Sequence, residues 1–148
     1  MPDSLDESQS YCLVERLSDA RIVELCGLYQ REFWSKGRTV DGVRRMLENT
    51  DVVVAFTDGP DGELVAFARV LTDEVYRAMI YDVIVDASHR GHGLGKLLMD
   101  AVVSHPQVRS VHHVELYCRA EMGDFYERWG FEVVTSDVHL MARSTSHS

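Results

Sequence analysis

The sequence predicts an α+β domain with a mixed, mostly antiparallel sheet. Apolar residues recur with helical spacing early in the chain, short apolar runs separated by turn residues follow, and the last part alternates strand-like with helix-like segments. The chain has 148 residues, enough for one domain with its own core. We expect this single domain over residues 11–143, with disordered tails at residues 1–10 and 144–148.

The early part is predicted to contain a short strand and two helices. The strand is expected at Tyr11–Leu17, and Ser18 is a residue type that begins helices. Apolar residues then follow at the spacing of one helical face: Ile22, Leu25, Cys26, Tyr29 and Phe33. A second helix is expected around three further apolar residues: Val43, Met46 and Leu47.

Strands are predicted for the middle of the chain. Val52–Phe56 and Leu64–Ala68 flank Asp58–Gly62, a loop of turn-forming residues, which predicts a β-hairpin. A third run, Met79–Val85, precedes a glycine-rich segment. The middle therefore supplies three of the expected strands.

Helices and strands alternate in the last part. An amphipathic helix is expected from Leu94 to Val102, and His105-Pro106 ends it. Three strands are expected around a short helix capped by Gly130: Val111–Cys118, Phe131–Thr135 and Val138–Met141. The sum is about six to seven strands with about four helices.

Composition limits the partners. Asp and Glu number 24 against 15 Lys and Arg, and the net charge of −9 argues against nucleic acid, whose phosphates are bound by Lys and Arg. No apolar run approaches the length of a membrane span, and the acidic first residues differ from a signal peptide. The three cysteines form no CxxC pair, which suggests reduced thiols. We expect a cytoplasmic monomer or homodimer with no membrane and no nucleic-acid partner.

The glycine-rich segment Arg90–Lys96 carries the strongest chemical signal. Glycine lets a ligand approach the backbone, and a helix N-terminus offers free N–H groups to an anion. Leu97 stands where a P-loop has Ser or Thr, and Lys96 replaces the third glycine of a dinucleotide fingerprint. The segment predicts a phosphate-binding loop of another kind, and a plain strand-to-helix turn is the alternative.

This segment resembles a signature of the GNAT N-acetyltransferase superfamily. In Tyr81–Lys96, Y-D-V-I-V-D-A-S-H-R-G-H-G-L-G-K, a strand is followed by R-x-x-G-x-G, with Arg90, Gly93 and Gly95 in the three defining positions. Asp124–Phe131, D-F-Y-E-R-W-G-F, is similar to the family's second signature, F-Y-x-x-x-G-F. The resemblance implies a GNAT-like fold.

The implied activity is transfer of the acetyl group of acetyl-CoA to a primary amine of a small molecule, by direct attack in a ternary complex. Two alternatives remain: a non-catalytic acyl-CoA binding or sensing domain, and a protein N-acetyltransferase. Acetyl-CoA is a co-substrate in this reaction, and no metal is expected, because the adjacent His112 and His113 point to opposite faces of a strand.

The resemblance also implies coenzyme-binding residues. The pyrophosphate is expected on the loop and helix N-terminus, formed by Arg90, Gly91, His92, Gly93, Leu94, Gly95 and Lys96. The pantetheine arm is expected to pair with the preceding strand at Val83, Ile84 and Val85, where that strand splays from the next. Arg119 and Met122 stand where many members have Asn and Ala, so the coenzyme contact of that Asn is in doubt.

Tyr126 matches the family's general acid, and an ordinary Tyr, with a pKa near 10, is protonated at neutral pH. A purely apolar role in the short helix is the alternative.

Asp82 is the first candidate for the general base or a substrate anchor, because a charge inside an apolar run is costly unless it is paired or used. Side-chain alternation places it on the face opposite to Tyr81 and Val83. Glu115 is the other candidate base, and a structural hydrogen-bonded role is the alternative for Asp82.

The acceptor site is implied around the first two helices and their loop, with Phe33, Trp34 and Tyr81 as contacts. The negative net charge favours a cationic acceptor. Basic residues of the loop instead suit an acceptor with a carboxylate or phosphate: Arg31, Lys36 and Arg38. Both possibilities remain open.

Overall fold

The computed structural model describes residues 10–134 and 137–145. It divides into two compact units, Met1–Tyr117 and Cys118–Ser148. The predicted tails lie mostly outside the described residues. Within the described residues, no helix is both long and apolar enough to cross a membrane.

The first unit is built on a five-stranded sheet with the order β1-β2-β3-β4-β5. The first four strands pair antiparallel and the fifth lies parallel to β4: β1 (Tyr11–Val14), β2 (Val52–Asp58), β3 (Leu64–Thr72), β4 (Arg77–Val85) and β5 (His113–Leu116). The mixed, mostly antiparallel sheet and the hairpin of β2 and β3 are therefore confirmed.

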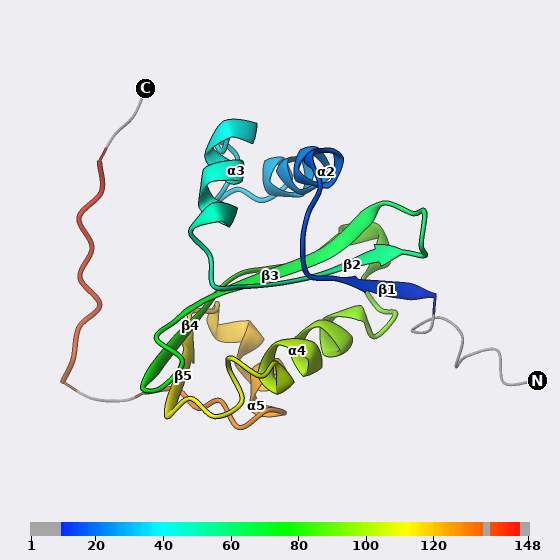
Figure 1. The fold of residues 1–148 in the computed structure, drawn as a ribbon. Helices are drawn as coiled ribbons and strands as arrows, with labels where there is room; N and C mark the ends of the chain where they lie inside the picture. Colours follow the sequence, from blue (N-terminus) through cyan, green and yellow to red (C-terminus); the bar gives the residue numbers. More distant parts are fainter. Residues whose placement is uncertain (1–9, 135–136, 146–148) are drawn as a thin grey trace, which may run out of the picture. The chain divides into compact units, whose positions relative to one another are not determined.

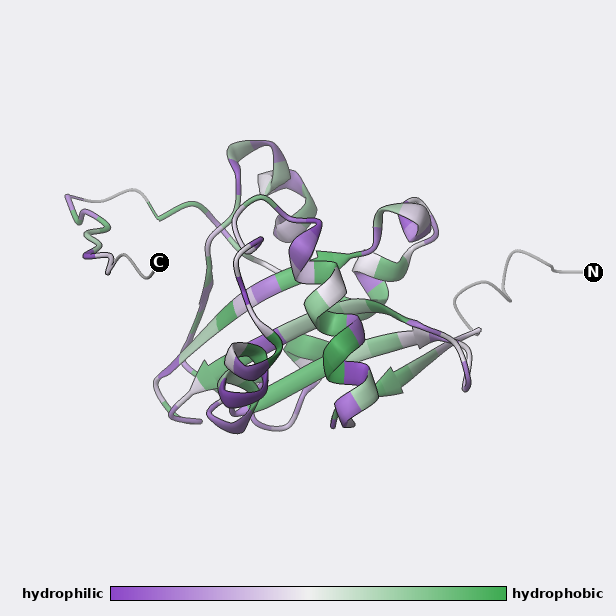
Figure 2. Ribbon diagram, turned by 90° about the horizontal axis from the view of Figure 1, so that it is seen from above, coloured by the Kyte–Doolittle hydropathy of each residue, from purple (hydrophilic) through white to green (hydrophobic). Residues whose placement is uncertain are grey.

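Helices cover both faces of this sheet (Figure 1). Two lie on one face, α2 (Asp19–Gln30) and α3 (Val40–Glu48), and α4 (Leu94–Ser104) lies on the other. The strands between them are hydrophobic over much of their length (Figure 2), as expected of a sheet buried on both sides. The α4 crossover allows β5 to run parallel to β4, because parallel neighbours need a long connection.

Helix α2 begins where the sequence predicts. The Ser18 hydroxyl accepts a hydrogen bond from the Arg21 backbone N–H, and Leu25 and Tyr29 are fully buried in a core with Phe67 of β3. The helix ends at Gln30, so the placement of Phe33 on its apolar face is wrong: Phe33 is 71% exposed. The chain turns there, since Arg31, Glu32 and Ser35 donate backbone bonds only three residues back.

The second unit contains η3 (Ala120–Met122) and α5 (Gly123–Glu127). Gly130 has a φ of 86°, which suits a residue that follows a helix end. No strand occurs in residues 131–134 or 137–145, so the expected strands Phe131–Thr135 and Val138–Met141 are not found there. Apolar character does not make a strand without a paired neighbour, and Val133 and Val138 are each 82% exposed.

Two strands of the first unit are also shorter than expected. β1 covers only Tyr11–Val14 of the predicted Tyr11–Leu17, and β5 covers only His113–Leu116 of Val111–Cys118. Each ends where its pairing with a neighbour ends. The described residues thus hold five strands instead of six to seven, with four α-helices as expected.

Candidate active site

A β-bulge in β4 sets the geometry of the site. Tyr81 pairs with Arg69 and Ile84 pairs with Phe67, so two residues of β4 stand opposite one residue of β3. Asp82 lies in the bulge with a φ of 58°, a left-handed conformation that Asp tolerates better than most residues.

The bulge overturns the expected alternation of side chains. The Arg69 guanidinium carbon lies 4.9 Å from the centre of the Tyr81 ring, and Arg69 Nε lies 2.6 Å from Asp82 Oδ2. Tyr81 and Asp82 therefore contact the same residue, although regular alternation places them on opposite faces. The extra residue of the bulge breaks the period of two.

Strands β4 and β5 separate next to the bulge. Their pairing runs from Arg77 opposite His113 to Ile80 opposite Leu116 and stops there. Beyond this point Tyr81–Val85 pairs with β3 on one side, and no described strand pairs with its other side. This stretch offers an edge to which an extended ligand can add as a strand.

The glycine loop, Arg90–Lys96, follows β4 after one turn of 3-10 helix, η2 (Ala87–His89). Gly91 and Gly93 have φ values of 87° and 78°, and a Cβ added at either would meet no atom within 4 Å. The requirement for glycine is therefore one of backbone conformation. The Leu97 N–H donates to the Gly93 carbonyl, so the N–H groups before it have no partner within α4.

Ion pairs connect this loop to the segment after α2. Arg31 lies 2.6 Å from Asp86, and Arg90 lies 3.6 Å from Glu32, while the Arg90 Nε also donates to the Val85 carbonyl. The predicted acceptor loop thus meets Arg90 and the end of β4 through ion pairs in which the arginines are exposed and the carboxylates are partly buried. Such pairs position chains more than they stabilise the fold.

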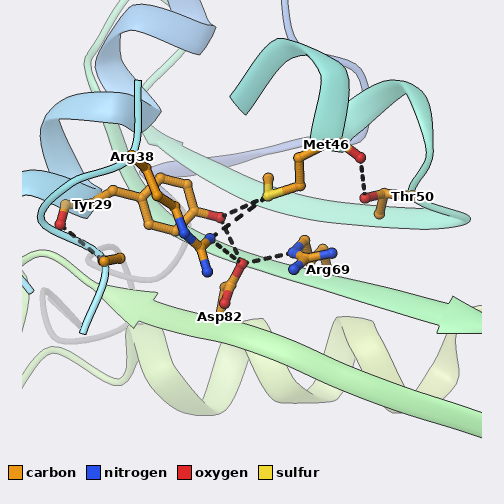
Figure 3. Close-up of polar contacts among 7 residues, drawn as sticks. Tyr29, Arg38, Met46, Thr50, Arg69 and Asp82 are labelled. Carbon is orange, nitrogen blue, oxygen red and sulfur yellow. Dashed lines mark hydrogen bonds and ion pairs between the residues drawn. The ribbon is translucent and has the colours of Figure 1, made fainter. Parts of the chain in front are cut away.

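A polar cluster surrounds Asp82 on the α2 and α3 side of the sheet (Figure 3). Asp82 Oδ2 accepts from the Tyr29 hydroxyl at 2.8 Å, from Arg38 at 2.8 Å and from Arg69 at 2.6 Å. The Asp82 side chain is 6% exposed, against 14% for Arg69 and 33% for Arg38. These four residues form what we name the Asp82 cluster, and Met46 of α3 contacts it through its sulfur.

Burial and hydrogen bonding act in opposite directions on Asp82. Burial alone raises its pKa, but the hydrogen bonds from Arg38, Arg69 and Tyr29 outweigh this and hold the pKa below its ordinary value. Burial, followed by the nearby Asp82 charge, raises the pKa of Tyr29 well above its ordinary value. At neutral pH the cluster holds an ionised Asp82, a neutral Tyr29 and two charged arginines.

Two of the three predicted acceptor contacts border this cluster. The Arg38 guanidinium lies 5.5 Å from the Trp34 ring, which also meets Tyr29 edge to face, and Tyr81 stacks with Arg69. Phe33 lies in the same connecting segment but is mostly exposed. Trp34 and Tyr81 are thus brought together with Asp82 through the two arginines.

Sequence reasoning missed Arg69 and Tyr29. A signal for Arg69 was present, because it interrupts the apolar strand β3 just as Asp82 interrupts β4. Opposite charges that interrupt neighbouring apolar strands predict a buried ion pair. Tyr29 gave no such signal, since its place on the apolar face of α2 is that of a core residue.

The second candidate base, Glu115 of β5, forms an ion pair with Arg77 at 2.8 Å, and its side chain is 40% exposed. Both candidate carboxylates are therefore paired with arginine. Among the described residues, no cluster of His, Cys, Asp or Glu has the composition of a metal site.

Tyr126 lies in α5 of the second unit and is buried. Its ring meets Phe125 and Phe131 edge to face. Burial, with a smaller contribution from Cys118, raises the pKa of Tyr126 to about 12. The phenol is therefore protonated throughout the neutral range. Arg119 and Met122, the positions that depart from the family pattern, are both largely exposed.

Comparison with known proteins agrees with this geometry. Residues 48–133 match the family model described as an acetyltransferase (GNAT) domain. The solved structure of a putative GNAT-family acetyltransferase from Xanthomonas campestris pv. campestris superposes with a TM-score of 0.74 and 29% identity, covering 90% of this chain and 94% of that one. The chain belongs to the GNAT acetyltransferase family.

Two curated plant proteins are similar over parts of their length. "Serotonin N-acetyltransferase 2, chloroplastic" from Oryza sativa subsp. japonica is 33% identical over 107 residues, which cover 71% of this chain and 54% of the relative. "GCN5-related N-acetyltransferase 2, chloroplastic" from Arabidopsis thaliana is 35% identical over 82 residues, which cover 51% of this chain and 32% of the relative. The chain thus spans about half of the first relative and about a third of the second.

Proposed function

We propose that the protein is an acetyl-CoA-dependent N-acetyltransferase that acts on a primary amine by direct attack in a ternary complex. The observation that carries this proposal is the succession of an open strand edge, Tyr81–Val85, and the glycine loop at the start of α4. The edge suits an extended pantetheine arm, and the loop suits a pyrophosphate. Membership of the GNAT family supports this assignment.

The residues proposed for coenzyme binding are those of these two segments. Val83, Ile84 and Val85 lie at the edge, and their backbone groups would bind the pantetheine amides. Gly91 and Gly93 keep side chains away from the first turn of α4, whose N–H groups would donate to phosphate oxygens. A backbone N–H of the same edge would donate to the thioester carbonyl oxygen as negative charge develops there.

In the proposed reaction the amine nitrogen forms a bond to the acetyl carbon, and the bond from that carbon to sulfur breaks. The thiolate that leaves takes a proton, and the amine loses one. We assign Tyr126 as the donor of the proton that the thiolate takes, since its raised pKa keeps it protonated. Glu115 is the proposed acceptor of the second proton, directly or through water, since its side chain is accessible.

Asp82 is proposed as a positioning residue. Its Oδ2 already accepts three hydrogen bonds, and a carboxyl with a lowered pKa is a weak proton acceptor. Its role would be to hold Arg38 and Arg69 in fixed orientations. Such a role corresponds to the structural hydrogen-bonded role that the sequence leaves as the alternative for Asp82.

Thiol release from acetyl-CoA, measured against a panel of small amines and of peptides with free amino groups, tests the proposal. Acetyl-CoA at a hundred times its Kd should stabilise the fold by about 2.7 kcal/mol. Gly93→Val should remove most of this stabilisation by blocking the approach to the backbone, while Gly27→Ala, in the middle of α2, should keep it. Binding without thiol release on the whole panel would support a sensing domain instead.

Tyr126→Phe tests the general acid. The ring and its burial remain, so the melting temperature and coenzyme affinity should hardly change. Single-turnover transfer should fall by roughly 10²–10⁴, the usual contribution of a general acid. Tyr76→Phe, at an exposed tyrosine of the β3–β4 turn, is the matched control. A fall of less than about threefold would contradict the role.

A further inference from the structure

The Asp82 cluster carries one more positive charge than negative. Two guanidinium groups, Arg38 and Arg69, share one carboxylate, and both bind the same oxygen atom of it. Tyr29 adds no charge, because its raised pKa keeps it neutral. A partly buried positive charge is therefore left over in a protein whose net charge is −9.

Arg69 also has unused hydrogen-bond donors. Only its Nε donates to a described acceptor, Asp82 Oδ2, so its two terminal nitrogens donate to none. Within the described part of the chain, every side-chain nitrogen or oxygen that is buried from solvent has a hydrogen-bond partner. The terminal nitrogens of Arg69 must therefore reach solvent, although the side chain is only 14% exposed. A planar guanidinium with its outer edge open suits a carboxylate or a phosphate.

Aromatic rings hold both arginines in place. The Tyr81 ring lies against Arg69, and the rings of Tyr29 and Trp34 lie against Arg38. Stacking fixes the plane of a guanidinium and leaves its edge for hydrogen bonds. Together with the Asp82 carboxylate, these contacts orient the two arginines before any ligand arrives.

The position of the cluster links it to the acceptor. Asp82 and Tyr81 lie where β4 separates from β5, at the edge along which the thioester is proposed to lie. An anionic group held by Arg69 would leave an amine of the same molecule close to that edge. The loop that carries Arg38 and Trp34 comes from the α2 side, from which the acceptor is expected to enter.

We propose that the acceptor is a small amine that carries a carboxylate or phosphate group, and that Arg69, assisted by Arg38, binds this anionic group. This inference rests on the proposed function and narrows its substrate class. It resolves the two conflicting signals of the sequence in favour of the local charge: the protein as a whole is acidic, but the Asp82 cluster carries excess positive charge. Serotonin, the amine in the name of the rice relative, lacks such an anionic group.

Matched pairs of acceptors test the inference. The members of each pair differ by one anionic group: serotonin and 5-hydroxytryptophan, cadaverine and lysine, glucosamine and glucosamine 6-phosphate. The anionic member of at least one pair should have the higher kcat/KM, by roughly 10- to 100-fold, the worth of a hydrogen-bonded charge pair. The first two pairs report a carboxylate and the third a phosphate, so the panel also separates these two sources.

Variants that change charge test whether Arg69 is the residue that binds the anionic group. Arg69→Gln removes the excess charge and should bring the kcat/KM ratio of the preferred pair close to one, and Arg69→Lys should keep part of the preference. Arg44→Gln, at an exposed arginine of α3, removes the same charge elsewhere and should leave the ratio unchanged. An unchanged ratio in a folded Arg69→Gln would contradict the role of Arg69.

Protection against thermal unfolding provides a readout that needs no turnover. The preferred anionic acceptor should raise the melting temperature of the wild-type chain more than its neutral partner does, and Arg69→Lys should reduce this difference. Thiol release that is equal or faster with the neutral member of every pair would overturn the inference and leave the transferase proposal intact. No thiol release with any acceptor, and no protection by anionic acceptors, would instead count against the proposed function, and the inference would fall with it.

Discussion

Asp82 and the glycine loop lie close together in the sequence, but the Asp82 cluster and the loop are built in opposite ways. In the cluster, side chains from α2, the following loop, β3 and β4 meet at one carboxylate oxygen. In the loop, Gly91 and Gly93 carry no side chain, and the first N–H groups of α4 have no partner within the helix. The protein balances most of the charge in the first region itself, whereas in the second it leaves donors for a ligand.

This difference has an energetic meaning. Removing a side chain from the cluster leaves buried charges without partners, which is costly. Adding a side chain to the loop forces a left-handed backbone on a residue that avoids it, which costs less. Stability should therefore depend strongly on the cluster, and ligand binding should depend strongly on the loop.

The largest expected effect is that of Asp82→Ala. It leaves Arg38 and Arg69 close together without a counter-charge and should lower the free energy of unfolding by about 3–5 kcal/mol. Urea unfolding measures this loss. Asp41→Ala breaks an exposed ion pair with Arg44 and should cost less than about 1 kcal/mol. Similar losses for both variants would show that the cluster does not stabilise the fold more than a surface pair.

Two glycine substitutions compare conformation alone. A Cβ added at Gly93 or at Gly27 would meet no atom within 4 Å, but only Gly93 has a positive φ. Gly93→Ala should therefore lower the free energy of unfolding by about 1–2 kcal/mol. Gly27→Ala, inside α2, should raise it by about 0.5–1 kcal/mol. Effects of the same sign in thermal or urea unfolding would refute this explanation.

Acidification should weaken the Asp82 cluster. The pKa of Asp82 is lowered in the folded state, so its ionised form adds stability above the unfolded value of about 3.9, and this stability is lost as the pH falls through the folded value. The difference in unfolding free energy between the wild type and Asp82→Asn should stay constant above about pH 5 and shrink below about pH 4. A difference that does not change down to pH 3 would contradict the ionised cluster.

The smallest expected effects concern the contacts between the two predicted loops. Arg31→Gln and Glu32→Gln remove one partner each from the pairs with Asp86 and Arg90, in which the arginine side chains are 65% and 59% exposed. Each should change the free energy of unfolding by less than about 0.5 kcal/mol, because exposed pairs contribute little. A loss above about 1 kcal/mol would make these pairs part of the fold's stability rather than of its loop geometry.

The two regions also differ in how well the sequence predicts them. The loop is a contiguous pattern, and its glycines, the helix after it and the strand before it lie where the sequence places them. The cluster joins Asp82 to residues 13 and 53 positions away, and no local pattern reports such distances. Arg69 and Asp82 could be suspected because each interrupts an apolar strand, but their partners depend on which strands and helices become neighbours.

The bulge shows the same limit on a smaller scale. Hydrophobic alternation predicts the face of every side chain in a regular strand, and it fails where one residue is inserted. The expected strands after Gly130 illustrate the complementary error: their apolar residues satisfy the local pattern, but strand formation requires a partner along the backbone. Element types were predictable from local periodicity, while pairing depended on distant parts of the chain.

The left-handed residue in β4 has a consequence for protein engineering. Deleting Val83 would restore continuous pairing with β3 and relieve the left-handed conformation of Asp82, which costs about 1–2 kcal/mol. The shortened strand would be more regular, yet it would turn either Tyr81 or Asp82 away from Arg69. Automated design that rewards ideal strands would choose this deletion and lose the arrangement of Tyr81, Asp82 and Arg69 that we propose selects the acceptor, so the bulge has to be held fixed in any redesign of this fold.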